Sequence, residues 1–91
     1  MKVLFDRSFE KSIDKIADVI IKKRVAKAII NMEDSASLEE IRNLKRLSGF
    51  EYYYRIRVGE YRIGMELIDH NTMRLIIIAH RKDIYRHFPR G

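Results

Sequence analysis

Cysteine is absent from this 91-residue sequence, and proline and glycine are scarce, with one and four residues respectively. A chain without cysteine has no disulfides and no thiolate metal ligands, so an apolar core must stabilise it. Because 46% of the residues are hydrophobic and 35% are charged, the composition is that of a folded protein and not of a disordered chain. The length predicts one compact domain that spans residues 1–91.

Long hydrophobic runs are missing as well. The first apolar run covers only residues 3–5, and the longest run covers residues 75–79. Both runs are too short for the apolar part of a signal peptide or for a membrane-spanning helix. Together with the missing cysteines, these short runs favour a location in the reducing cytoplasm.

Basic residues outnumber acidic ones by 19 to 13, which gives a net charge of +6. Such a domain is a candidate for binding polyanions: nucleic acid, an acidic protein or a membrane surface. The kind of basic residue changes along the chain, because residues 1–49 contain seven Lys and four Arg, whereas residues 50–91 contain one Lys and seven Arg. A guanidinium group can bind a phosphate through two parallel hydrogen bonds, so the second half of the chain is the better suited to phosphate recognition.

The first half of the chain has the pattern of a strand followed by two helices. Residues 2–5 suit a strand, and Ser8 suits the N-cap of a helix. One apolar stripe at helical spacing consists of Phe9, Ile13, Ile16 and Ile20. A second stripe, out of phase with the first, consists of Ile21, Val25, Ala28, Ile29 and Met32. The change of phase predicts a break near residues 18–20 and two packed helices.

The second half of the chain has the pattern of an antiparallel meander. Ser37 and Glu40 have capping-box spacing before a short segment that ends at Ser48 and Gly49. Residues 52–58, 61–68 and 72–80 are then rich in β-branched and aromatic side chains. We therefore expect an α+β fold of order β-α-α-β-β-β, with two N-terminal helices on one face of a small, mainly antiparallel sheet. A short helical turn should follow over residues 83–88, and the other sheet face should be open to solvent or ligand.

The loop between the first two strands of this meander determines which side chains share a face. A two-residue loop with Gly59 at its first position fits a type II′ turn, which sets Arg57 opposite Arg62 and Arg55 opposite Gly64. The face turned away from the helices is called here the arginine face, and it should carry Tyr53, Arg55, Arg57, Arg62, Gly64 and Glu66. The last strand should add Leu75, Ile77, Ala79 and Arg81 to this face, with Ile76 and Ile78 on the helix side.

Arginines paired directly across two strands are unfavourable by a few tenths of a kcal/mol or more. Their convergence on one face is what binding a phosphodiester, and stabilising its extra charge during cleavage, would require. Gly64 would leave an open place where a ligand could approach the backbone, and Tyr85 and Tyr53 could stack on unpaired bases. A basic docking strip for an acidic protein, without any chemistry, fits the same pattern.

Three segments resemble the RelE/ParE superfamily of toxins from type II toxin-antitoxin pairs, and RelE-type mRNA interferases in particular. They are LKRLSG at 44–49, YYRIRVGEYRI at 53–63 and IIIAHRKDIYR at 76–86. The resemblance covers nearly the whole chain and implies the RelE-like microbial RNase fold. It implies an endoribonuclease that needs no metal or other cofactor and cleaves translated mRNA, in RelE itself at the ribosomal A site, by attack of the ribose 2′ hydroxyl on the adjacent phosphate. The implied partners are mRNA, the ribosome and a separately encoded acidic antitoxin, with operator DNA reached only through the antitoxin complex and no membrane partner.

The resemblance also implies the site residues. The catalytic set consists of Arg55, Arg57, Arg62, Arg81 and Tyr85, and the further RNA-binding residues are Tyr53, Lys82 and Arg86. Phosphate binding and transition-state stabilisation are implied for three of the arginines, and stacking or proton exchange for Tyr85. Arg57 departs from the pattern because it stands where RelE has a lysine proposed as the general base, and arginine is a poor proton acceptor. The alternative acceptors are Glu51, Glu66, His80 and Tyr85, although His80 falls on the helix side.

Two other functions remain open. A ParE-like toxin would inhibit DNA gyrase without nuclease activity, and a non-catalytic module would only bind nucleic acid or an antitoxin. The complete arginine and tyrosine set favours the nuclease, because ParE-like chains generally lack it. No glycine-rich phosphate loop or nucleophile elbow is present, and His70, His80 and His87 lack the spacing of a zinc site, so no metal is expected.

Overall fold

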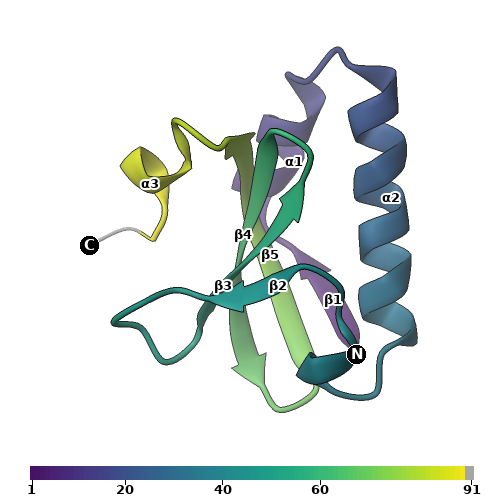
Figure 1. The fold of residues 1–91 in the computed structure, drawn as a ribbon, viewed down its shortest axis with the longest axis vertical. Coiled ribbons are helices and arrows are strands. Elements are labelled where there is room, and N and C mark those ends of the chain that lie inside the picture. The colour runs from purple at the N-terminus through teal and green to yellow at the C-terminus, as the bar shows by residue number, and fades with distance from the viewer. Residues whose placement is uncertain (90–91) are drawn as a thin grey trace.

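The computed structural model describes residues 1–89, which form a five-stranded sheet with helices on both sides. The elements are β1 (Lys2–Phe5), α1 (Arg7–Asp14), α2 (Val19–Asp34), a 3-10 turn (Leu38–Glu40), β2 (Leu44–Arg46), β3 (Tyr53–Val58), β4 (Tyr61–Asp69), β5 (Thr72–His80) and α3 (Ile84–His87). The strand order is β1-β5-β4-β3-β2, and only β1 and β5 run parallel. Figure 1 shows α1 and α2 on one side of the sheet and α3 on the other. The expected α+β fold is confirmed.

Aspartates, and not Ser8, begin the two N-terminal helices. The Asp6 carboxylate accepts hydrogen bonds from the Ser8 backbone N–H at 3.4 Å and from the Ser8 hydroxyl at 2.6 Å, so the prediction of Ser8 as the N-cap is wrong. Asp18 Oδ1 accepts from the N–H groups of Ile20 and Ile21 at 2.9 and 3.2 Å. The expected break between the helices is confirmed, but Ile20 lies in the first turn of α2, where it is 70% exposed and outside the core.

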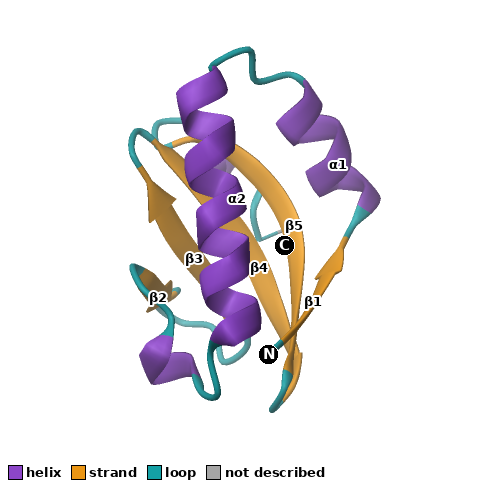
Figure 2. Cartoon of the chain, turned by 90° about the vertical axis from the view of Figure 1, so that its right-hand side faces the viewer, coloured by secondary structure: helices purple, strands orange, loops and turns teal. Residues whose placement is uncertain are grey.

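The main core lies between these helices and the sheet. Its buried members are Phe9, Ile16, Ile21, Val25, Met32, Ile41, Ile56, Val58, Ile63, Met65, Met73, Leu75 and Ile78. Both predicted helical stripes contribute to it, and α2 runs across the face of the sheet (Figure 2). Burying a side chain of this kind stabilises the fold by about 1.5–3 kcal/mol, so the core holds the sheet as a rigid platform.

The hairpin of β3 and β4 has the predicted register. Val58 faces Tyr61, Arg57 faces Arg62 and Arg55 faces Gly64. Gly59 has a φ of +59°, which is the left-handed conformation that the first position of a type II′ turn requires. The hairpin therefore places its arginines on the face opposite α1 and α2.

The pairing of β4 with β5 contains a bulge that the sequence pattern did not indicate. Gly64 faces Ile77 and Met65 faces Leu75, which leaves Ile76 without a partner. A single extra residue reverses the alternation of side chains on one side of it. Leu75 is therefore fully buried in the main core, and Ile76 lies on the arginine face, so their predicted sides were wrong. Beyond the bulge, Ile78 faces the core as expected.

The segment before Ser48 adds an edge strand that was not predicted. Leu44 of β2 faces Ile56, and Arg46 faces Tyr54. Ser37 makes no side-chain cap hydrogen bond, whereas the Glu40 carboxylate accepts from the Ala36 N–H at 3.2 Å. Within residues 1–89, no helix is both long enough and apolar enough to cross a membrane.

Candidate active site on the arginine face

The structure brings together the five side chains that were predicted as catalytic. Arg55 and Arg57 come from β3, Arg62 from β4, Arg81 from the end of β5 and Tyr85 from α3. Burial lowers the pKa of Arg62, and the positive charges of Arg55, Arg57 and Arg81 lower it further, while Tyr85 acts in the opposite direction. The other four groups thus lie within electrostatic reach of Arg62, and the set of five is called the arginine cluster below.

Arg62 is the most firmly held member of the arginine cluster. Its Nη1 donates to the carbonyl oxygens of Gly59 and Tyr61, both at 2.9 Å. These bonds fix the guanidinium against the hairpin turn and leave its other N–H groups for a ligand. Donors fixed in advance stabilise developing charge without having to reorganise during a reaction.

Arg81 is held from the other side of the same turn. Its backbone N–H donates to the Glu60 carbonyl oxygen at 2.7 Å, and its Nε lies 3.2 Å from Glu60 Oε1. The two side chains are 52% and 64% exposed, and an ion pair this exposed contributes little to stability. Its effect is positional, since it ties the end of β5 to the hairpin.

Helix α3 covers part of the arginine face that was expected to be open. The ring of Phe88 lies on Gly64, where a Cβ atom would come within 2.6–2.8 Å of three ring atoms. Phe88 is 1% exposed and Ile84 is fully buried. The prediction that Gly64 leaves an open place for a ligand is therefore wrong. The missing side chain of Gly64 makes room for the ring of Phe88.

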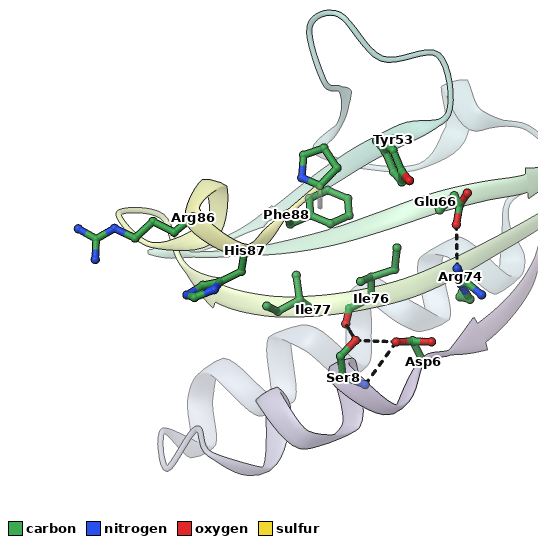
Figure 3. Close-up of a pocket in the computed structure, with 11 residues that line it drawn as sticks. Asp6, Ser8, Tyr53, Glu66, Arg74, Ile76, Ile77, Arg86, His87 and Phe88 are labelled. Atoms are coloured by element: carbon green, nitrogen blue, oxygen red, sulfur yellow. Dashed lines mark hydrogen bonds and ion pairs between the residues drawn. The ribbon is translucent and has the colours of Figure 1, made fainter. Parts of the chain in front are cut away.

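The same contact determines where Tyr85 lies. Tyr85 follows the buried Ile84 in α3 and is itself 57% exposed. Docking of Ile84 and Phe88 thus holds the Tyr85 phenol at the edge of the arginine cluster, open to solvent. Tyr53 is half-buried, and its ring contacts the ring of Phe88 edge-on at a centroid distance of 5.4 Å (Figure 3). The ring of Phe50 also contacts Tyr53 edge-on, at a centroid distance of 5.5 Å.

The proposed proton acceptors differ in what they contact. Glu66 lies on the arginine face, but its Oε1 is bound by Arg74 Nη2 at 2.9 Å. His80 lies on the helix side as expected, with its ring edge-on to Tyr61, and its Nδ1 accepts from the Lys82 N–H at 3.2 Å. Glu51 is exposed in the loop before β3.

The remaining predicted RNA contacts, Lys82 and Arg86, are exposed. Arg86 lies 3.8 Å from Asp83 in an exposed pair, and its guanidinium points away from the neighbouring groove (Figure 3). That groove, of about 790 Å³, lies beside Phe88 on the same sheet face and is lined by both acidic and basic groups, among them Glu66 and Arg74.

Three residues important to the site were not found from the sequence. Glu60 orients Arg81, while Ile84 and Phe88 anchor α3. Their signal was present, because Ile84 and Phe88 are four residues apart and thus share one side of a helical turn. Within residues 1–89, no group of three or more His, Asp or Glu side chains is arranged to hold a metal ion.

Known toxins resemble this chain over nearly its whole length. The family model for the ParE toxin of the type II toxin-antitoxin system parDE matches residues 3–85. The chain is 40% identical to Toxin RelE3 of Methanocaldococcus jannaschii over 90 residues, which cover 98% of this chain and all of that protein.

Solved structures of toxin-antitoxin complexes contain chains of the same fold. The toxin in the RelB-RelE antitoxin-toxin complex from Methanococcus jannaschii superposes with a TM-score of 0.78 and 37% identity, covering 94% of this chain and 99% of that one. A chain of the intact E. coli RelBE toxin-antitoxin complex shares the fold, with a TM-score of 0.67, 21% identity and coverage of 87% and 94%.

Proposed function

Since the chain belongs to the RelE/ParE family of type II toxin-antitoxin toxins, we propose that it is a RelE-type endoribonuclease that cleaves translated messenger RNA, without a metal, at the ribosomal A site. The observation that carries this proposal is the arginine cluster, in which three further guanidiniums and one phenol lie within electrostatic reach of Arg62 on the arginine face. Cleavage would stop translation and growth. We further propose that residues 1–91 act as one domain in the cytoplasm.

The proposed reaction is an attack by a ribose 2′ oxygen on the adjacent phosphorus. The 2′ hydroxyl loses its proton, the bond from phosphorus to the 5′ oxygen of the next nucleotide breaks, and that oxygen takes up a proton. The products are a 2′,3′-cyclic phosphate and a free 5′ hydroxyl. Extra negative charge develops on the phosphate oxygens, where fixed positive donors are most effective.

The cluster offers a different role to each arginine. Arg62, fixed by two carbonyl bonds, and Arg81, tied to Glu60, are suited to bind the phosphate oxygens in the transition state. Arg55 and Arg57 supply further charge from the neighbouring strand. Because a guanidinium hardly releases its proton, Arg57 contributes charge and is not the base.

Tyr85 is the group best placed to exchange a proton with the RNA. It is 57% exposed and lies within electrostatic reach of Arg62. Glu66 is paired with Arg74, and His80 lies on the opposite face, so neither has the same access. Tyr85 could also stack on a base, and the attack could draw on a ribosomal group for its second proton step.

The inactive state is proposed to be a complex with a separately encoded antitoxin. The relatives of known structure are RelB-RelE and RelBE complexes. An acidic antitoxin segment would be complementary to the net charge of +6, and operator DNA would be reached only through that complex.

A second candidate function is a ParE-like inhibitor of DNA gyrase. It is favoured by one observation, that the matching family model describes the ParE toxin. It would leave messenger RNA intact and would not require the arginine cluster to be complete.

Primer extension on messenger RNA from cells, after brief induction of the chain, separates these functions. We expect new cleavage ends within translated frames, and we expect the Arg62→Ala, Arg81→Ala double variant to reduce them at least about 100-fold, since removing a single such donor costs roughly 10²–10³ in rate. The Lys11→Ala, Lys15→Ala variant removes the same charge from exposed positions of α1 and its C-cap and should cleave as the parent does. Growth arrest with intact messages and gyrase-linked DNA breaks would replace the nuclease with the ParE-like function.

A further inference from the structure

A second concentration of positive charge lies in a groove between α2 and β3, around the β3 edge from the arginine cluster. The groove has a volume of about 270 Å³. It is lined by Arg24, Lys27, Ala28, Asn31, Arg42, Asn43, Ile56, Arg57 and Val58. Four of these nine residues are basic and none is acidic, so the groove differs from the mixed groove beside Phe88.

Three segments that are distant in the sequence build this groove. Arg24, Lys27 and Asn31 are spaced so that they share one side of α2, which lies beside β3 in Figure 2. Arg42 precedes β2, and its backbone N–H donates to Asn31 Oδ1 at 3.0 Å, which ties the two segments together. The ladder of β2 with β3 ends at Ile56, beyond which the Arg57 N–H donates to the Asn43 carbonyl oxygen at 3.4 Å, so Arg57 lies where the edge strand ends.

Arg57 belongs to both the groove and the arginine cluster. It lines the groove, and its charge also lowers the pKa of Arg62 on the arginine face. The hairpin turn also links the two sites, because Gly59 lies between Arg24 and Arg62. Arg24 Nη1 is 3.0 Å from the position that a Cβ atom on Gly59 would occupy, and the Gly59 carbonyl oxygen accepts a hydrogen bond from Arg62. Positive charge is therefore continuous from the arginine cluster, around the sheet edge, to α2.

The groove's basic side chains have no acidic partner within 4 Å among residues 1–89. Like charges gathered around a hollow repel one another, and an anionic ligand would relieve that repulsion. The continuity through Arg57 favours a polymer with a negative charge on every unit over a separate acidic peptide.

We propose that this groove is a second phosphate-binding site, which takes the backbone of the substrate RNA strand where it passes around the β3 edge from the arginine cluster. The inference rests on the proposed function, because it assigns the groove to the same RNA. It predicts that Arg24, Lys27 and Arg42 contribute to RNA affinity and not to the chemical step.

Two triple variants of equal charge test the groove. One is R24Q, K27Q, R42Q; the other is K11Q, K15Q, K22Q, whose positions are exposed and outside the groove. Affinity is measured by fluorescence anisotropy with a single-stranded RNA that carries 2′-O-methyl groups and cannot be cleaved, at several salt concentrations. We expect the groove variant to bind at least about 10-fold more weakly and its salt slope to fall by about 2, since each phosphate contact to a single strand contributes about 0.7. The control should change affinity less than about 3-fold.

Equal losses in both triple variants would overturn the groove in favour of a net-charge effect, and so would an unchanged affinity in the groove variant. A groove variant that binds RNA normally but loses affinity for the purified acidic antitoxin would assign the groove to that protein instead. Single-turnover cleavage on ribosomes with bound messenger RNA separates the two proposals. If the groove substitutions weaken RNA binding but the parent chain does not cleave messenger RNA, the proposed nuclease activity is wrong and the proposed phosphate-binding groove is retained.

Discussion

Arg57 and Arg62 face each other across β3 and β4, yet the two side chains are held differently. Arg62 donates to two carbonyl oxygens of the hairpin turn and is half-buried, whereas Arg57 is exposed at the strand edge. The repulsion between them is therefore partly offset by the carbonyl dipoles that hold Arg62. In the proposed function, identical residue types in a directly opposed pair thus suit two tasks, a fixed phosphate ligand at Arg62 and an exposed charge at Arg57 that is shared with the groove between α2 and β3.

Asp6 is a residue whose contribution depends on pH. Its hydrogen bonds to the Ser8 hydroxyl and N–H and the charge of Arg74 lower its pKa below 3.8, and burial opposes them. A folded-state pKa below the unfolded value means that the stabilisation is complete above pH 3.8 and is lost as the pH falls through the folded pKa. We expect Asp6→Ala to reduce the free energy of unfolding by about 1 kcal/mol at pH 6, the usual value for an N-cap.

The difference between Asp6→Ala and the parent should shrink progressively as the pH falls below 3.8 towards the folded pKa of Asp6, as urea titrations at a series of pH values would show. Asp14→Ala serves as the control, because Asp14 is exposed at the other end of α1 and caps nothing. An Asp6→Ala deficit that is the same at pH 6 and pH 3 would show that the carboxylate charge does not contribute to the cap.

At the scale of elements, the periodicity of the sequence predicted the regular helices and strands but not the irregularities in the sheet. The hairpin register followed from Gly59, because a two-residue turn allows only one pairing of Arg57 with Arg62. The bulge at Ile76 could not be predicted in this way. Because β5 is apolar on both faces there, no alternation of polar and apolar residues indicates which side chains face the core. The edge strand β2 is only three residues long and polar at two of them, so its pairing with β3 is a tertiary effect that no local pattern encodes.

The candidate site was likewise predicted only in part. The four arginines could be picked out because their charges stand out along the strands, whereas the packing of α3 over the arginine face was not predicted. Its anchor depends on the absence of a side chain at Gly64, twenty or more residues away from Ile84 and Phe88. Such complementarity is visible only once the two segments are placed against each other.

In the proposed nuclease, docking of α3 on Gly64 should affect the cleavage rate through the position of Tyr85. In Gly64→Ala the new methyl group would come within 2.6 Å of the Phe88 ring, so α3 must shift and carry Tyr85 away from the cluster. We expect the single-turnover cleavage rate to fall at least about 10-fold, a modest loss for a displaced catalytic group, with RNA affinity changed less than about 3-fold. The rate and the affinity are measured separately, on ribosomes with bound messenger RNA and on uncleavable RNA.

A second substitution distinguishes displacement of α3 from general damage. The Gly64→Ala, Phe88→Leu variant makes room for the methyl group with a smaller side chain and should recover part of the lost rate. Phe50→Leu removes an exposed aromatic ring from the same face without touching α3 and should be neutral. If Gly64→Ala cleaves like the parent, Tyr85 does not need the position that α3 gives it.

In the whole molecule, buried apolar side chains form two groups on opposite faces of one sheet. The main core joins α1 and α2 to the sheet, whereas Ile84 and Phe88 are buried on the arginine face and do not belong to that core. The two layers differ in size, because α2 has 16 residues and α3 has four. The fold thus combines a large rigid platform with a small cover that can open locally.

This arrangement predicts that α3 can open without unfolding of the rest of the molecule. Ile63→Ala, in the main core and fully buried, should reduce the free energy of unfolding by about 2–5 kcal/mol. Phe88→Ala should shift the same urea transition by less than about 1 kcal/mol, because the unanchored helix opens locally and leaves the core intact. Hydrogen exchange should then be faster at the Phe88-position N–H, which donates to the Ile84 carbonyl, and unchanged at amides of β4. Equal loss of stability in both variants would instead mean that α3 folds cooperatively with the sheet, and the catalytic effect of Gly64→Ala would then have to be separated from global unfolding.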